Sequence, residues 1–231
     1  MTLRATTMPI EVQARSGRQV AALLGGLIAL WVAVGSPLAE LDHHLLAAHM
    51  AQHLLLMTVS APLILLGVPA LRSMSKAIRP AFCWLAGTGV VIAWHVPALF
   101  ELGMSSPYWH AFEQASFLAA GLLFWSPVIQ ALRDQPSPAS ARWHIPLYLF
   151  LATLPCDALS AFLTFCDRVV YPNYASAHRL FDISPLGDQE FAGALMWVWV
   201  TFVYLAPAAA ITIQLLSPQR DVLDGRAQLR S

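Results

Sequence analysis

The stretch HLLAAHMAQHLLLMTVSAPLILLG, residues 44–67, decides the fold class of this chain. Apart from its histidines and one glutamine it is as apolar as a membrane span, and it exceeds the roughly 20 residues that a helix needs to cross a bilayer. It nevertheless carries histidines at positions 44, 49 and 53. Ionisable side chains are costly inside a bilayer, so they usually face the interior of a bundle and serve a function.

The composition extends this interpretation to the whole chain. Of its 231 residues, 58% are hydrophobic and only 11% are charged, and the mean hydropathy is +0.60. A soluble domain carries about 25% charged residues. The basic residues are scattered over several connectors, which does not favour nucleic-acid binding. No P-loop or G-x-S-x-G motif occurs, so nucleotide and hydrolase chemistry are unsupported. The composition predicts an all-α, polytopic bundle in a lipid bilayer.

The apolar stretches predict six transmembrane helices, and a seventh would require the last stretch to be split. The expected organisation is an N-terminal segment at 1–18, a bundle at 19–216 and a tail at 217–231. The six predicted spans are 19–37, 45–67, 81–104, 109–131, 145–166 and 188–216.

The distribution of Lys and Arg predicts the orientation of these helices. Eleven of the 13 basic residues fall in the N-terminal segment, the second and fourth connectors and the tail. Only Arg168 and Arg179 fall on the other side. Because Lys and Arg favour the cytoplasmic side, both termini are predicted to be cytoplasmic. A basic start followed by an apolar run also suits a cleaved signal peptide at residues 1–35, which would leave the direction of the later helices unchanged.

With this topology, ionisable residues from five helices gather in one layer beneath the outer surface. His49 and His53 lie about 6 and 12 Å below the outer end of their helix, on one face because they are four residues apart. His95 lies about 21 Å above the inner end of the third span. The other members of the layer are His110 and Glu113 on the fourth span, Asp157 on the fifth and Asp188 at the start of the sixth.

This layer predicts a metal site. Two imidazoles at i and i+4 can clamp a metal ion on a helix face, and His95 or His110 can supply a third nitrogen. Glu113, Asp157 and Asp188 are candidates for a further ligand or for acceptors that orient the imidazoles. Imidazole suits copper, zinc and iron, and nearby methionines such as Met196 favour copper, although methionine in an apolar helix is more often core filler. Copper is the preferred assignment, with zinc and iron as alternatives.

Four stretches resemble the multi-pass CtaG family of cytochrome c oxidase assembly factors, in the right order and over about residues 20–216. They are HMAQHLLLMTVSAPLILLGVP (49–69), WHVPALFE (94–101), HAFEQASFLAAGLLFWSPV (110–128) and LGDQEFAGALMW (186–197). The resemblance implies a multi-pass protein of the bacterial inner membrane that helps to make a haem–copper oxidase and to deliver copper to it. The implied partners are oxidase subunits or a periplasmic copper carrier.

The resemblance also assigns positions. The family's characteristic residues map onto His49, Gln52, His53, Trp94, His95, His110, Glu113, Asp188, Gln189, Gly193, Met196 and Trp197. This chain has Gln114 where the family pattern often has a histidine, and it has Cys156 and Asp157 where many members are less polar. These departures point to a subgroup with a different ligand set.

Three functions compete for these residues. The leading prediction is an assembly factor that binds a metal and is not an enzyme. The alternative is a membrane metalloenzyme or haem protein in which His95 and a histidine of the 45–67 helix bind the centre. A copper permease ranks last, because the inner half offers only His144 and Cys83 as polar or sulfur ligands.

Overall fold

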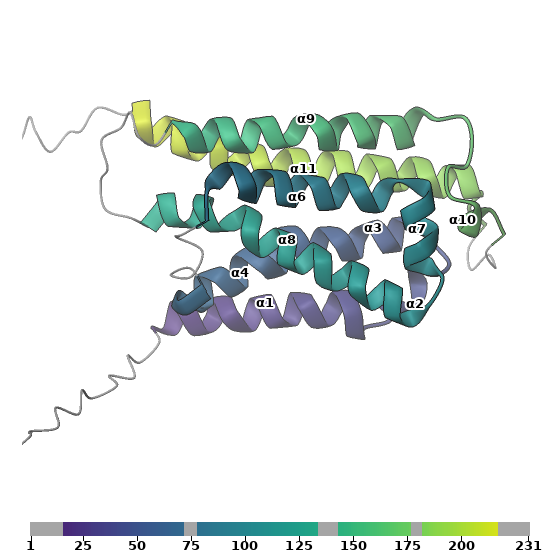
Figure 1. Ribbon diagram of the computed structural model, residues 1–231, viewed down its shortest axis with the longest axis horizontal. Coiled ribbons are helices and arrows are strands. Elements are labelled where there is room, and N and C mark those ends of the chain that lie inside the picture. The colour runs from purple at the N-terminus through teal and green to yellow at the C-terminus, as the bar shows by residue number, and fades with distance from the viewer. Residues whose placement is uncertain (1–15, 72–77, 134–142, 177–181, 217–231) are drawn as a thin grey trace, which may run out of the picture.

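The computed structural model describes residues 16–71, 78–133, 143–176 and 182–216, and within these ranges all regular structure is helical. The long helices run side by side along one axis (Figure 1). The all-α bundle that the composition predicts is therefore confirmed. The elements are α1 (Gly17–Gly35), α2 (Leu38–Leu41), α3 (Leu46–Leu54), η1 (Leu55–Ser60), α4 (Ala61–Gly67), α6 (Pro80–His95), α7 (Pro97–Met104), α8 (Pro107–Arg133), α9 (His144–Phe165), α10 (Pro172–Ser176) and α11 (Pro185–Leu216).

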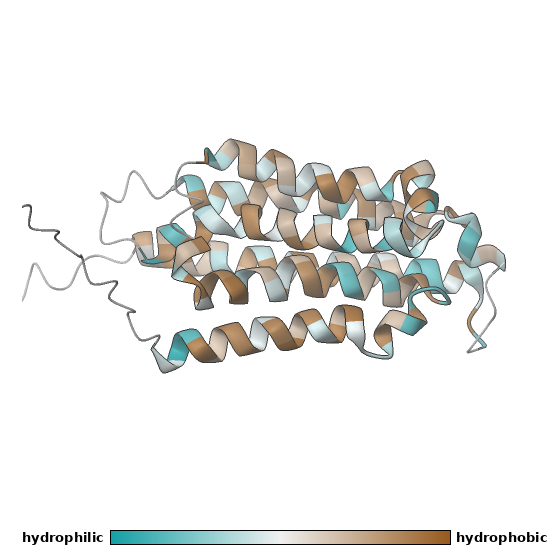
Figure 2. Ribbon diagram, turned by 60° about the horizontal axis from the view of Figure 1, so that its bottom comes forward, coloured by the Kyte–Doolittle hydropathy of each residue, from teal (hydrophilic) through white to brown (hydrophobic). Residues whose placement is uncertain are grey.

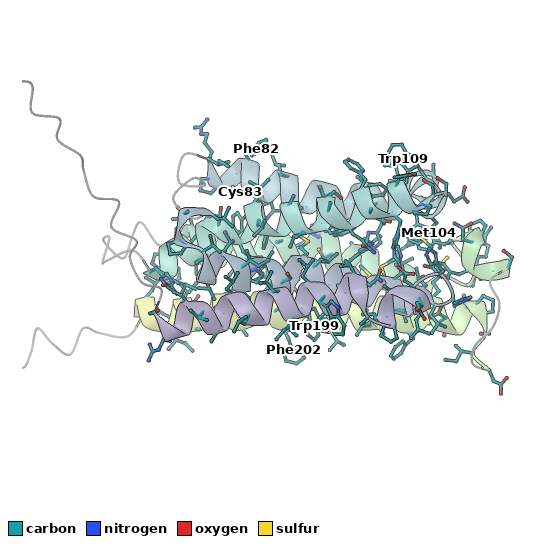
Figure 3. All side chains as sticks on the ribbon, turned by 90° about the horizontal axis from the view of Figure 1, so that it is seen from below. Phe82, Cys83, Met104, Trp109, Trp199 and Phe202 are labelled. Atoms are coloured by element: carbon teal, nitrogen blue, oxygen red, sulfur yellow. The ribbon has the colours of Figure 1, made fainter. Side chains whose placement is uncertain are left out.

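Five of these helical stretches are long and apolar enough to cross a membrane by themselves, and a sixth qualifies if the bent pair α6–α7 counts as one span. Their flanks are hydrophobic (Figure 2). Phe82 and Phe202, which point outward from the bundle in Figure 3, are 58% and 70% exposed. Side chains of this kind suit contact with lipid rather than water.

The third predicted span is not one straight helix. It bends by 80° between α6 and α7, at Val96. Pro97 explains the bend, because it disfavours helical geometry in the preceding residue and cannot donate a backbone hydrogen bond. Here α7 turns across the end of the bundle that also carries α2 and α10, which we call the α7 end (Figure 1).

The last predicted span stays in one piece. Helix α11 runs without a break from Pro185 to Leu216, including Pro207, so the described residues give no seventh span. Of the four described Lys and Arg residues, Arg18, Arg79 and Arg133 stand at the bundle end opposite α7, and Arg168 stands at the α7 end, as the sequence predicts. Which side of the membrane that end faces stays a prediction, and most of the terminal segments lie outside the described residues.

The span that contains α3 and α4 is interrupted by the π-helical turn η1, directly after His53. In this turn the Ala61 N–H donates to the carbonyl of Leu56, five residues back. The carbonyl of Met57 instead accepts the indole N–H of Trp125 on α8, at 3.0 Å. A π turn is often found at functional sites, because it shifts the faces of the helix on either side of it.

Candidate metal centre

The centre is built on α3, whose one face carries His49 and His53. The two rings meet edge to face with their centroids 4.3 Å apart, and both side chains are buried. His53 also stacks on Phe117 of α8 at a centroid distance of 3.8 Å. The i, i+4 spacing thus places two imidazoles inside the bundle, as the sequence predicts.

Glu113 on α8 brings a carboxylate to these imidazoles. Its Oε1 lies 3.4 Å from His49 Nε2 and 3.5 Å from His53 Nε2, and all three side chains are buried. Their ligand atoms lie within 4.8 Å of one another, a spacing that can hold a metal ion. Gly103 on α7 makes room for the carboxylate, because a Cβ there would come within 2.6 Å of Glu113 Oε2.

A second group adjoins the first and shares His49 with it. Asp42, His49 and His110 also bring their ligand atoms within 4.8 Å of one another. His110 Nε2 lies 2.8 Å from Asp42 Oδ2, while His110 Nδ1 lies 3.6 Å from Glu113 Oε2. The exposed His43 reaches the same aspartate at 3.6 Å, so the two groups form a path inward from the surface.

Many polar atoms of these groups have no hydrogen-bond partner among the described residues, although they are buried. The carboxylate oxygens of Asp42 and Glu113 and both nitrogens of His49 and His53 are in this state. The ion-pair distances above are short, but the atoms are not aligned for hydrogen bonds. A buried polar atom without a partner costs about 1–3 kcal/mol. A cation in the middle of the group would satisfy several of them at once.

Gln114, which replaces the histidine common in the family pattern, takes part in this network. Its side-chain nitrogen lies 2.7 Å from His110 Nε2 and 3.4 Å from the Gln52 side-chain oxygen. The helix α8 therefore brings one imidazole to the cluster, and an amide stands one turn further along.

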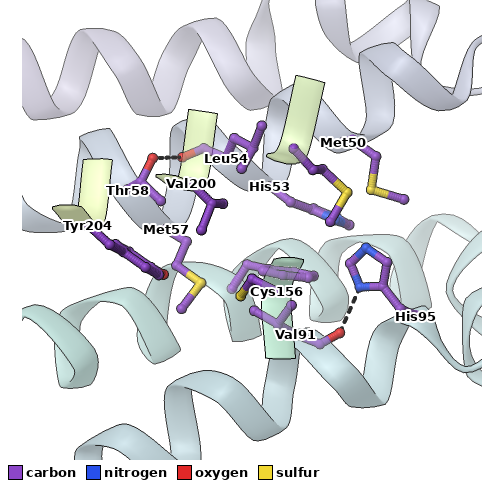
Figure 4. A pocket seen from close by; sticks show the side chains of 12 residues that line it. Met50, His53, Leu54, Met57, Thr58, Val91, His95, Cys156, Val200 and Tyr204 are labelled. Carbon is purple, nitrogen blue, oxygen red and sulfur yellow. Dashed lines mark hydrogen bonds between the residues drawn. The ribbon is translucent and has the colours of Figure 1, made fainter. Parts of the chain in front are cut away.

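His95 and Met196 lie apart from the two groups, around a cavity of about 30 Å³. His53 lines both the cavity and the cluster, so the two sites are neighbours. Figure 4 shows His95, Met57 and Cys156 directed into this space. The predicted layer is therefore divided into a carboxylate–imidazole cluster and a cavity lined by sulfur and imidazole.

The two remaining acidic candidates have other contacts. Asp188 accepts the backbone N–H groups of Leu46 at 2.7 Å and Ala47 at 3.1 Å. It therefore caps α3, the helix that carries the histidines, rather than its own. Asp157 is half-buried and accepts a 3.4 Å hydrogen bond from Thr201 on α11. Neither belongs to the groups that can hold a metal among the described residues.

Several residues near the centre were not predicted from the sequence. Asp42 was assigned to a connector, but it is fully buried, and its signal was its place directly before two histidines. Tyr171 and Tyr174 come from the loop around α10 and donate to the carbonyls of His95 at 3.1 Å and Asp42 at 2.6 Å. Burial raises the pKa of both phenols, so they keep their protons and remain donors.

The fold and the site define a class: a helical membrane protein with a buried histidine–carboxylate cluster at one end of its bundle. The family model described as cytochrome c oxidase caa3 assembly factor (Caa3_CtaG) matches residues 1–217. The chain therefore belongs to this family of assembly factors, as its sequence motifs indicate. No curated protein and no solved structure matches the chain.

Proposed function

We propose that this protein sits in a bacterial inner membrane and supplies a metal ion, copper as the best match, to a haem–copper cytochrome c oxidase during assembly. The observation that carries the proposal is the convergence of His49, His53 and Glu113, three buried side chains whose ligand atoms lie within 4.8 Å. Their buried nitrogens and oxygens lack aligned hydrogen-bond partners among the described residues, and a cation between them would satisfy several at once. Family membership supplies the role in oxidase assembly.

The arrangement suits transfer better than permanent storage. The group of Asp42, His49 and His110 lies between the exposed His43 and the deeper group, and His49 belongs to both. A metal ion can exchange ligands one at a time along such a series, without leaving protein ligands. With the α7 end facing the periplasm, as the basic residues predict, the series opens toward an assembling oxidase or a periplasmic copper carrier.

The protein acts in this proposal as a carrier and not as an enzyme. The haem-binding alternative is less favoured, because the cavity beside His95 is small, at about 30 Å³. Two imidazoles and a carboxylate suit copper, zinc or iron, and the sulfur ligands next to His53 favour copper.

Metal binding by purified protein tests the proposal. His49→Ala and His53→Ala should each lower metal affinity at least about tenfold, because each removes one ligand. Both variants should still insert and fold, because neither change creates a buried charge. His144→Ala is the matched control, since His144 is exposed at the opposite end of the bundle and should bind like the wild type.

The same variants test the role in the cell. Membranes from cells that produce only the His49→Ala protein should contain oxidase subunits with less copper than the His144→Ala control. Normal affinity in either His49→Ala or His53→Ala would refute the cluster. If a variant loses metal affinity as expected but the oxidase in its membranes is still fully loaded with copper, the delivery role is refuted.

A further inference from the structure

A small cavity lies against the His49–His53–Glu113 cluster, on the side away from the α7 end. It is lined by residues of α3, η1, α6, α8, α9 and α11, and its volume of about 30 Å³ exceeds the roughly 10–15 Å³ that a cavity needs to hold one water molecule. Leu54, Val91, Phe117 and Val200 give part of it the apolar walls of an ordinary packing gap. The ligand-bearing residues here are Met50, Met57, Met196, Cys156, His53 and His95.

His95, which lines this cavity, has one ring nitrogen with a free lone pair. His95 Nδ1 lies 2.7 Å from the backbone carbonyl of Val91 (Figure 4). A carbonyl can only accept, so Nδ1 carries the proton and Nε2 of the neutral ring keeps its lone pair. His95 is only 7% exposed, and Nε2 has no hydrogen-bond partner among the described residues. A hydrogen bond of this kind is what commonly fixes the tautomer of a ligating histidine.

We propose that this cavity is a second metal position, selective for a soft monovalent ion such as Cu(I). Thioether and thiol groups select soft ions, whereas the carboxylate of Glu113 in the neighbouring cluster suits harder ones. Methionine has three rotatable side-chain bonds, so Met57 and Met196 can close around an ion beside His95. A cavity of about 30 Å³ has room for one ion.

The position of His53 links the two sites. Its Nε2 lies 3.5 Å from Glu113 Oε1, and its ring also lines the cavity. An ion can therefore pass between the cluster and the cavity with His53 as a common ligand. This deepens the proposed function and rests on it for the direction of transfer, but ion binding in the cavity can be measured separately.

The experiment uses two probes on the purified full-length protein in detergent. Ag(I) represents a soft monovalent ion that does not change its redox state, and Zn(II) represents a borderline divalent ion. Affinities are measured by competition with chelators. The double variant Met57→Leu/Met196→Leu should lower Ag(I) affinity at least about tenfold and leave Zn(II) affinity unchanged. His49→Ala should do the reverse.

Methionine and cysteine residues outside the cavity provide matched controls. Met104→Leu and Cys83→Ser should leave both affinities unchanged. Cys156→Ser, which changes a residue that lines the cavity, should lower the Ag(I) affinity alone. Unchanged Ag(I) affinity in the double variant would overturn the cavity site and leave the cluster standing. A wild type that binds Ag(I) but no Zn(II) would instead remove the cluster on which the proposed function rests, and leave the cavity site standing. If the double variant fails to fold, each single methionine-to-leucine variant, which conserves volume, decides the question.

Discussion

The two halves of the bundle share close helix packing and differ in what their polar side chains do. In the half away from α7, helices approach closely at glycines: a Cβ at Gly26 would meet the Ser60 carbonyl at 3.1 Å, and one at Gly67 would meet the Leu23 backbone at 2.7 Å. Small residues allow the close approach that stabilises helix pairs in lipid. In the half near α7, such an approach recurs at Gly193, where a Cβ would meet the Ser160 carbonyl at 2.9 Å, and long-range hydrogen bonds from polar side chains also hold the helix ends and loops in place.

Gln189 illustrates the second kind of contact. Its side-chain oxygen accepts from the backbone of Val170 at 2.7 Å, and its nitrogen donates to the carbonyls of Leu163 at 3.3 Å and Arg168 at 3.0 Å. Such bonds position backbone without filling the cluster, whose polar atoms stay unpaired. The half away from α7 is therefore held by close helix packing, whereas the half near α7 keeps a group of buried polar atoms that have no hydrogen-bond partner among the described residues. Substitutions should therefore separate stability from metal binding.

The largest effect is expected in the half away from α7, for Gly121→Leu on α8. A Cβ at this position would lie 2.7 Å from the Met57 carbonyl oxygen and 2.8 Å from the Ala61 Cβ. Because backbone of the π turn stands in the way, the clash cannot be relieved by a rotamer change, and the cost should exceed the ~1–3 kcal/mol of ordinary overpacking. We expect little folded protein after extraction in mild detergent, as measured by size-exclusion chromatography.

Gly89→Leu is the matched control for this variant. It introduces the same side chain on the neighbouring helix α6, where an added Cβ meets nothing within 4 Å. The variant should fold and elute like the wild type. Equal behaviour of the two leucine variants would show that this half does not depend on the close approach at Gly121.

Much of the fold and of the cluster can be predicted from the sequence, for physical reasons. Apolar length sets the helices, so the spans that contain α1, α3–α4, α8, α9 and α11 are confirmed within a few residues. The i, i+4 spacing places His49 and His53 on one face, and α8, which begins at the same end of the bundle as α3, brings Glu113 to the same depth. That these residues bind a metal stays a prediction.

The features that the sequence did not predict depend on tertiary contacts, which the spacing of apolar and polar residues along the chain does not reveal. The role of Asp188 follows from a bond to a helix 142 positions away in the sequence, and Asp42 is buried because its loop folds back over the cluster. The bend at Val96 was signalled by Pro97, but the apolar run continues through it and favours a single span. The division of the predicted layer into cluster and cavity likewise depends on side-chain packing across four helices.

An intermediate effect is expected for Asp188→Asn, which tests the half of the bundle near α7. Both carboxylate oxygens accept N–H groups of α3, and an asparagine would present one N–H₂ group to a donor. Loss of a helix cap costs about 0.5–2 kcal/mol. We therefore expect a lower melting temperature. Metal affinity should fall less than about tenfold, because losses of about 10- to 100-fold are typical for residues that hydrogen-bond directly to a metal ligand, and Asp188 bonds only to backbone.

Asp157→Asn is the control, because its carboxylate accepts a 3.4 Å bond from Thr201 and caps no helix. It should leave the melting temperature and the metal affinity near those of the wild type. If the Asp188→Asn protein has normal stability but loses well over tenfold in metal affinity, Asp188 does not act mainly as a helix cap and is again a candidate metal ligand.

The smallest effect is expected for Tyr174→Phe, which acts on the loop that covers the cluster. The phenol donates a 2.6 Å hydrogen bond to the Asp42 carbonyl, and the ring lies 6.5 Å from that of His49. Phenylalanine keeps the ring and removes the donor, so the cost should be about 1 kcal/mol. Because this bond holds the backbone of Asp42 in place, the metal should also dissociate a few-fold faster, roughly the factor that 1 kcal/mol represents.

Chelator-driven release measures this rate, and Tyr108→Phe, at a position that is 88% exposed, is the control that should release metal at the wild-type rate. If Tyr174→Phe also releases metal at that rate, the loop around α10 does not control access to the cluster, and exchange must then be limited by the ligands themselves.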